Sequence, residues 1–134
     1  EHGRDQLHDL FPQYYTTKES AILPAECMYE IHKGDNAGWP YIYYNQILKK
    51  QILMPEYGGD GKKTADKKYL NPVIAFPGHL APNDLMFYTG NQFPERYKNG
   101  AFIAFHGSWN RSPEPQAGYF VVFVPFKDGK PTGK

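Results

Sequence analysis

The sequence predicts an all-β fold, and three observations support this prediction. Aromatic residues make up 16% of the chain, and strands favour aromatic and β-branched side chains. The 13 glycines and 12 prolines interrupt nearly every segment, which is typical of short strands joined by many turns. Two apolar runs of strand length, residues 101–105 and 119–126, lack alternation between polar and apolar positions. Such runs are typical of strands that are buried on both faces.

The expected elements follow one another along the chain without a helix of ordinary length. Residues 1–25 are polar and rich in turns, and residues 46–70 show no clear pattern. Strands are expected from hydrophobic patterning, and a single helical turn and a tight Asn-Gly turn are expected before residue 101. The strands are predicted at residues 26–32, 39–44, 71–76 and 84–89, the helical turn at 93–97 and the tight turn at 99–100. Short meandering strands of this kind are expected in a sandwich or in propeller blades.

Composition excludes two classes of partner and indicates a piece of a larger protein. With 15 basic and 14 acidic residues and scattered lysines, the chain has no basic stripe for nucleic acid. No apolar run approaches the ~20 residues that a membrane-spanning helix needs. Cys27 is the single cysteine, and we expect it to be a buried apolar residue in a strand. The chain begins Glu-His-Gly-Arg, without Met or a signal-peptide pattern, and we expect it to belong to something longer.

A polar loop at residues 106–111 separates the two apolar runs, and loops carried on rigid strands often hold functional residues. Arg111 offers a guanidinium that stays charged and matches a carboxylate bidentately. His106 has two open roles, a hydrogen bond to a ligand or a satisfied histidine at a strand end. Trp109 also has two, stacking on a ligand or filling a core. Ser108 lacks the surroundings of a hydrolase nucleophile.

Five sequence blocks occur in one order along almost the whole chain, to about Gly133. They are His2-Gly3-Arg4-Asp5-Gln6-Leu7, Gly38-Trp39-Pro40-Tyr41, His79-Leu80-Ala81-Pro82-Asn83, Phe105-His106-Gly107-Ser108-Trp109-Asn110-Arg111 and residues 118–126. Together they resemble the glucose/sorbosone dehydrogenase family, particularly its sorbosone- and pyranose-dehydrogenase-like branch. The resemblance implies a quinoprotein sugar dehydrogenase that uses pyrroloquinoline quinone (PQQ) and Ca²⁺. Such an enzyme oxidises a sugar or sugar aldehyde at C1 by hydride transfer to the quinone.

The fold implied by this resemblance is a six-bladed β-propeller with PQQ and calcium over its central channel. A blade needs about four strands, so 134 residues would supply about two to three later blades. Residues 1–134 are therefore expected to form one partial propeller domain, with the earlier blades outside this chain. Its open strand edges and apolar blade faces would then be exposed. The fragment alone is expected to be inactive.

The resemblance also implies roles for individual residues around the cofactor. The loop matching residues 2–5 lends backbone carbonyls to calcium, which prefers oxygen ligands, so Gly3 and Arg4 are expected at the metal. Arg4 is also expected beside the cofactor. Arg111, His106 and Trp109 match a loop that faces PQQ, and Arg111 is the best candidate for holding a PQQ carboxylate.

Two further motifs match the family near the channel. His79 and Asn83 could shape the substrate entrance, or the neighbouring prolines could simply brace their loop. Gly38-Trp39-Pro40 is expected to be a structural turn, with Trp39 packed between blades. The general base of the family, a histidine with an acidic partner, is expected upstream of Glu1, so no residue is assigned to it.

The partners implied by the resemblance are a sugar substrate, an external electron acceptor or cytochrome c domain, and the remainder of the chain's own propeller. The sequence has no C-x-x-C-H haem motif of its own. A periplasmic or secreted location is expected, since PQQ and calcium occur there. One alternative stays open, a non-catalytic propeller that binds a carbohydrate or protein partner, because one fold hosts many functions. A structural surface module is a third reading.

Overall fold

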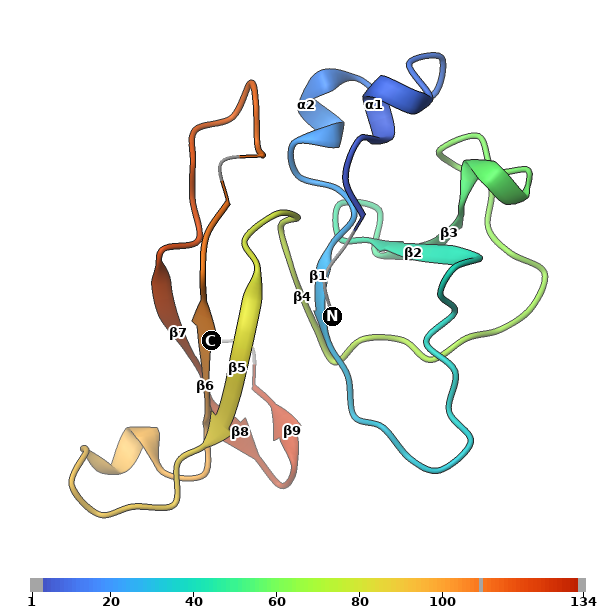
Figure 1. The fold of residues 1–134 in the computed structure, drawn as a ribbon. Helices are drawn as coiled ribbons and strands as arrows, with labels where there is room; N and C mark the ends of the chain where they lie inside the picture. Colours follow the sequence, from blue (N-terminus) through green and yellow to red (C-terminus); the bar gives the residue numbers. More distant parts are fainter. Residues whose placement is uncertain (1–3, 109, 133–134) are drawn as a thin grey trace.

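Strands dominate the structure, a computed structural model that describes residues 4–108 and 110–132, and this confirms the all-β prediction. Figure 1 shows three antiparallel units side by side: the β5–β6–β7 sheet, the β1–β4 ribbon in the middle and the β2–β3 hairpin. The strands are β1 (Glu26–Met28), β2 (Ile42–Asn45), β3 (Lys50–Leu53), β4 (Ile74–Phe76), β5 (Pro82–Phe87), β6 (Ala101–Phe105), β7 (Phe120–Val124), β8 (Phe126–Lys127) and β9 (Lys130–Pro131). The short helices are α1 (Leu7–Leu10), α2 (Thr17–Ser20), η1 (Pro55–Tyr57) and η2 (Glu95–Tyr97).

The central strand of the three-stranded sheet has the bounds that its apolar run predicted. In β6, Ala101, Ile103 and Phe105 are buried on the face that packs against the β1–β4 ribbon. The helical turn before it forms as η2, and Asn99 takes a φ of 60°, as the predicted tight turn requires. The turn closes through a hydrogen bond from the Gly100 amide to the carbonyl of Tyr97, at 3.3 Å, and the Asn99 amide donates across the β5–β6 loop to the carbonyl of Tyr88, at 2.8 Å.

Burial on both faces was expected for residues 119–126, and this expectation is wrong for the beginning of the run. Tyr119, Phe120 and Val121 are 61%, 44% and 63% exposed, and Val124 alone is buried among the described residues of β7. The physical reason is position: β7 is an edge strand of its sheet, and no further described strand pairs with its outer edge. The apolar run therefore predicted the strand correctly, but it did not predict the exposure of the side chains at the beginning of the run.

The β1–β4 ribbon joins residues that are far apart in sequence. Cys27 pairs with Ala75 and is buried, as expected for a lone apolar cysteine. The strand is shorter than the predicted 26–32, because its partner β4 has three residues and pairs with positions 26–28 only; the turn that follows is held by a hydrogen bond from the amide of His32 to the Asp35 carboxylate, at 2.7 Å.

Two regions that were expected to be irregular contain regular elements. The first 25 residues form α1 and α2, and strand β3 lies in the weakly patterned stretch 46–70. In α2 the Thr16 hydroxyl accepts from the Glu19 amide at 3.1 Å, while the Glu19 carboxylate accepts from the Thr16 amide at 2.8 Å. This reciprocal pair is a capping box, which stabilises the start of a helix.

The buried side chains form two separate hydrophobic clusters. The first joins α1, the segment around α2 and the β2–β3 hairpin; it comprises Leu7, Tyr15, Leu23, Tyr43, Ile52 and Met54. The second joins the β5–β6–β7 sheet to the ribbon; it comprises Leu80, Ala101, Ile103, Phe105 and Val124. In the described part of the chain, no helix is both long and apolar enough to cross a membrane.

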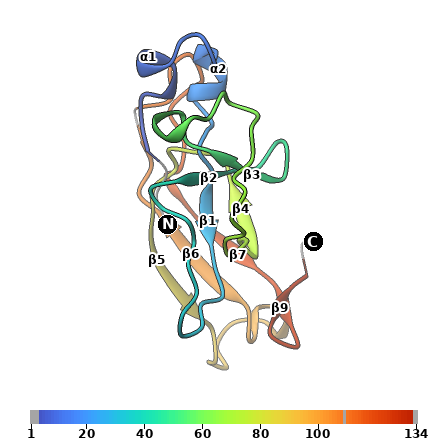
Figure 2. The same cartoon turned by 90° about the vertical axis from the view of Figure 1, so that its right-hand side faces the viewer.

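The loops that carry the predicted site residues meet at one end of the molecule. The helices α1 and α2, the turn between β4 and β5 and the long connection between β6 and β7 all lie in the upper half of Figure 1. Figure 2 shows the same end from the side, with the loop around η2 at the opposite end.

Candidate functional site

Arg111 is buried in the connection between β6 and β7, where its guanidinium holds two segments together. It is 8% exposed, its Nη1 donates to the carbonyl of Gly78 at 2.7 Å, and its Nε donates to the carbonyl of Pro115 at 3.2 Å. No described residue accepts a hydrogen bond from Nη2. The guanidinium is thus fixed by backbone carbonyls and keeps one edge for a further acceptor.

Close backbone contact fixes the base of this connection against the β4–β5 turn. Gly118 has a φ of 97°, and a Cβ there would lie 2.5 Å from the carbonyl oxygen of Leu80. The amide of Gly107 donates to the same carbonyl at 3.0 Å. Only glycine allows the backbone at position 118 to come this close to Leu80. The position of the Arg111 loop against Leu80 is therefore fixed.

The β4–β5 turn holds two residues other than glycine in the left-handed region, His79 at a φ of 63° and Ala81 at 55°. Such conformations cost free energy and persist where surrounding contacts determine them. Here the carbonyl of Ala81 accepts from the His106 amide at 2.8 Å, and its amide donates to the Glu26 carboxylate at 3.3 Å. The turn is therefore rigidly held where it meets the candidate site.

His79 connects this turn to the N-terminal segment. Its buried ring lies with Nδ1 2.9 Å from Oδ1 of Asp5, and with Nε2 2.8 Å and 3.1 Å from the carbonyl oxygens of Ser20 and Leu23. All three neighbours accept hydrogen bonds, so the ring satisfies them fully when both nitrogens carry hydrogen. Both nitrogens are occupied, and this arrangement orients segments rather than presenting a free base.

Arg4 connects the N-terminal segment to η1. Its guanidinium forms an ion pair with the Glu56 carboxylate, and its Nε donates to the carbonyl of Asp5 at 3.3 Å. The guanidinium also lies 6.0 Å from the ring centre of Phe11. Arg4, His79 and Arg111 thus belong to one connected polar assembly at the same end of the molecule.

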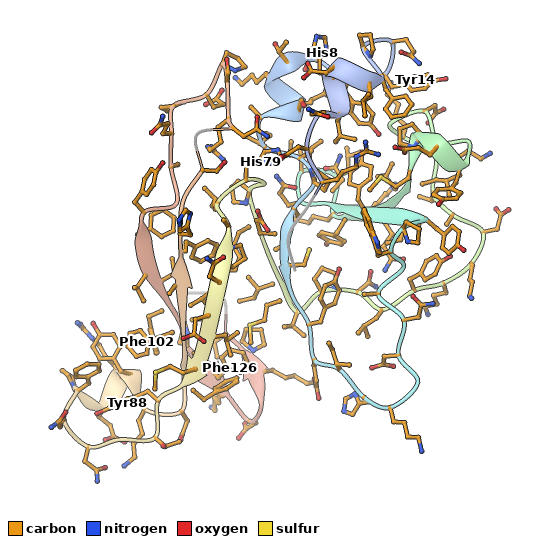
Figure 3. All side chains as sticks on the ribbon, in the orientation of Figure 1. His8, Tyr14, His79, Tyr88, Phe102 and Phe126 are labelled. Carbon is orange, nitrogen blue, oxygen red and sulfur yellow. The ribbon has the colours of Figure 1, made fainter. Side chains whose placement is uncertain are left out.

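A polar cavity of about 280 Å³ lies beside this assembly. Its lining comes from the N-terminal segment, α2, the β4–β5 turn and the Arg111 loop, and includes Gln6, His8, Asp9, Ser20, His79 and Asn110. Figure 3 shows His8 and His79 at this end and Tyr88, Phe102 and Phe126 at the other. The Nδ1 of His8 lies 2.7 Å from the carbonyl of Tyr15 and donates to it.

Tyr15, whose carbonyl lies against His8, has its side chain in the first hydrophobic cluster. The hydroxyl of Tyr43 donates to that of Tyr15 at 3.2 Å. Burial raises the pKa of the Tyr15 phenol and, more strongly, that of Tyr43, whose bond to Tyr15 raises it further. Both phenols therefore stay neutral and act as packing groups.

His106 and Asn83 do not join the assembly as closely. His106 is exposed at the end of β6, with Nδ1 2.9 Å from the Gly107 carbonyl, which leaves Nε2 open to solvent or a ligand. Asn83 lies at the irregularity in β5 and lines a different, mainly apolar groove of about 540 Å³ beside Cys27 and Ile103. His79 and Asn83, predicted together at a substrate entrance, therefore face different hollows.

Two predicted site residues, Gly3 and Trp109, lie outside the described residues. Trp39, which was expected to pack between blades, is 62% exposed in this chain. Sequence reasoning missed Asp5 and Glu56 as the partners of His79 and Arg4. The Arg-Asp pair in the first block was visible, but no local signal indicates which distant side chains meet it.

The donors present fit the predicted cofactor in part. PQQ carries three carboxylates, and Arg111 can offer Nη2 to one of them, whereas Arg4 must leave Glu56 to hold another. Among the described residues, no three His, Cys, Asp or Glu side chains gather as a metal site. The metal site expected from the sequence uses backbone carbonyls, which are not members of such a group.

A family model described as TrAA12-like matches residues 38–134. The chain is 32% identical over 112 residues to an uncharacterized protein of Borreliella burgdorferi, a match that covers 84% of this chain and 25% of that protein. It is 45% identical over 56 residues to a pyrroloquinoline quinone-dependent pyranose dehydrogenase of Coprinopsis cinerea, covering 42% of this chain and 7% of the enzyme. The chain thus spans about a quarter or less of the curated relatives it matches. No solved structure matches it.

Proposed function

Because the chain belongs to the TrAA12-like family, we propose that it forms part of a PQQ-dependent dehydrogenase that oxidises a sugar at C1. The likeness to the Coprinopsis cinerea enzyme supports the cofactor and the substrate class. The observation that carries the proposal is the meeting of three separate sequence blocks at one end of the fold. Arg4, His79 and Arg111, each from a different block, belong there to one hydrogen-bonded assembly.

In this proposal Arg111 holds one carboxylate of PQQ through Nη2. Its bonds to the carbonyls of Gly78 and Pro115 fix the guanidinium before the cofactor arrives. Fixed donors lose little conformational entropy when they bind an anion. His106 contributes its Nε2 to the cofactor or the substrate, and Trp109 stacks on one of them. Arg4 approaches a second carboxylate.

The proposed metal ligands are the backbone carbonyls of Gly3 and Arg4. Bound Ca²⁺ would polarise the quinone, and PQQ would accept the hydride that leaves C1 of the sugar. This chain's contribution is positional. The Asp5–His79 contact joins the N-terminal segment, which carries the proposed metal ligands, to the β4–β5 turn. The bond from Arg111 to Gly78 joins that turn to the connection between β6 and β7. His79 and Asn83 are proposed to shape the access of substrate, and the base that takes the hydroxyl proton belongs to another part of the protein.

The proposed architecture is a part of a six-bladed propeller with about two to three blades in this chain. The three antiparallel units support it, since each has two or three strands where a blade has about four. The exposed apolar residues of edge strand β7 support it as well, because a neighbouring blade would cover them. We propose further that the protein acts in the periplasm or outside the cell, with an external acceptor or a cytochrome domain.

The test is calorimetric titration of the full-length protein with PQQ in the presence of calcium. Arg111→Ala should weaken binding by about 1.5–3 kcal/mol, the range for one lost charge-assisted hydrogen bond. Arg96→Ala is the matched control, because Arg96 is exposed in η2 at the opposite end. Arg111→Lys keeps the charge but cannot hold the Gly78 carbonyl and a PQQ carboxylate at the same time. Its PQQ affinity should lie between those of Arg111→Ala and the unaltered protein.

PQQ binding that is unchanged in Arg111→Ala would refute the proposed contact between Arg111 and a PQQ carboxylate. Absence of PQQ binding by the unaltered protein would refute the dehydrogenase itself and favour the non-catalytic alternative, a propeller that binds a carbohydrate or protein. Circular dichroism of each variant distinguishes lost binding from lost folding.

A further inference from the structure

A further hollow, with a volume of about 470 Å³, is lined by Arg4 and Asp5 and shares Gln6 with the polar cavity. It is referred to here as the Trp39 cleft. Its lining comes from three segments and includes Arg4, Asp5, Gln6, Trp39, Glu56 and Tyr57. None of the roles proposed for PQQ or calcium uses the side chain of Trp39, Gln6 or Tyr57.

Aromatic side chains provide the apolar part of the Trp39 cleft. Trp39 is 62% exposed and Tyr57 is 47% exposed. Tyr57 is held in place by Tyr41, whose ring lies edge-on with the centroids 4.8 Å apart. Exposed aromatic rings beside a hollow offer rigid flat faces with a negative quadrupole. The C–H face of a pyranose ring is apolar and slightly positive, and matches such a surface.

Amide and carboxylate groups provide the polar part. The Gln6 side-chain amide has no hydrogen-bond partner among the described residues, so its donor and acceptor are both available. Asp5 uses Oδ1 for His79 and is 55% exposed at its side chain, which leaves Oδ2 as an acceptor at the cleft. A hydroxyl group both donates and accepts, and these two side chains suit a row of hydroxyls.

The charged groups around the cleft already have partners within the protein. Arg4 pairs with Glu56, and Oδ1 of Asp5 lies 2.9 Å from Nδ1 of His79. An anionic ligand would have to separate Arg4 from Glu56, and a cation would compete for Asp5. Because these groups are already engaged, a neutral ligand is favoured over a phosphate or a polycarboxylate.

We infer that the Trp39 cleft is a saccharide subsite that binds one neutral pyranose ring, with Trp39 as its stacking surface and Gln6 and Asp5 as its hydroxyl contacts. The inference rests on the proposed function for the class of ligand, but it requires neither PQQ nor calcium. The subsite places sugar beside Arg4, so it would hold a ring of the substrate close to one of the proposed metal ligands.

The test uses the full-length protein without cofactor and methyl α-D-glucopyranoside, whose blocked C1 prevents oxidation. Binding is measured by calorimetry and by saturation-transfer NMR. Trp39→Ala should weaken binding at least about tenfold, as truncation of a central aromatic contact does, and Trp39→Phe should weaken it less. Phe93→Ala is the control, since Phe93 is also an exposed aromatic residue, 53% exposed, in the loop around η2. It should leave glycoside binding unchanged.

Each outcome separates this inference from the proposed function when PQQ is titrated in parallel. Glycoside binding that is lost in Trp39→Ala, with PQQ binding intact, supports the subsite. Glycoside binding that is equal in Trp39→Ala and the unaltered protein overturns it, and so does absence of glycoside binding in the unaltered protein. Glycoside binding through Trp39 without any PQQ binding leaves the subsite standing and refutes the dehydrogenase. Since Trp39 is mostly exposed, its variants should keep the thermal stability of the parent.

Discussion

Replacing Gly118 with alanine should destabilise the protein by more than backbone conformation alone explains. Gly118 has a φ of 97°, a region that residues with a Cβ rarely adopt. The new Cβ would lie 2.5 Å from the carbonyl oxygen of Leu80 and 2.8 Å from the Cα of Gly107. Both are backbone atoms, so no side-chain rotation relieves the contact and the loop itself must shift.

The expected magnitude has three contributions. A left-handed φ costs alanine about 1–2 kcal/mol, and the lower entropy of the unfolded chain returns about 0.4–1 kcal/mol. Displacing the tightly packed backbone adds about 1–3 kcal/mol. The free energy of unfolding should therefore fall by about 1–4.5 kcal/mol in Gly118→Ala. Gly34 isolates the first two contributions, because its φ is 93° and an added Cβ would meet nothing within 4 Å.

Urea denaturation followed by circular dichroism measures both variants on the same parent. Gly34→Ala should lose about 1 kcal/mol or less, and the difference between the variants gives the cost of the contact with Leu80. Equal losses in the two variants would show that the loop adjusts freely at Gly118. The close contact of Gly118 with Leu80 would then not constrain the position of the connection between β6 and β7.

Two further predictions concern the first cluster and the segment beside it. Thr16→Ala removes one half of the capping box with Glu19 and should cost about 1 kcal/mol of unfolding free energy in the same urea assay; no change would mean that α2 does not depend on its cap. Because burial holds the phenols of Tyr15 and Tyr43 neutral in the folded state, their raised pKa values should make stability constant below about pH 10 and lower as the pH rises beyond it, where the unfolded phenols ionise. Thermal melts of the parent and of Tyr43→Phe between pH 8 and pH 11 test this, and an equal alkaline loss in both would contradict it.

The sequence predicted strands well where side-chain type alone decides. β6 has the predicted bounds because its apolar residues and the Asn99-Gly100 turn specify it locally. The capping box of α2 was equally local, and Thr16 with Glu19 could have revealed that helix. Exposure of Val121 was not predictable in this way, since it depends on what lies beyond an edge strand.

The candidate site shows the same limit more sharply. The residue types in the five blocks indicated which side chains carry charge and which loops matter. They did not indicate that Arg111 would donate to a carbonyl 33 positions away, or that His79 would meet Asp5. Such contacts are set by how β1 and β4 bring distant loops to one end, which no local pattern encodes.

The division of the interior into two clusters gives the polar cavity a mechanical role. One cluster takes its residues from positions 7–54, and the other takes its buried residues from positions 80–124. Units built from separate stretches of chain can open separately. The cavity is lined by residues from both stretches of chain, such as His8 from the first and Asn110 from the second. A ligand bound there would contact both stretches of chain and disfavour the separate opening of either one. Amide hydrogen exchange should then slow in both at once.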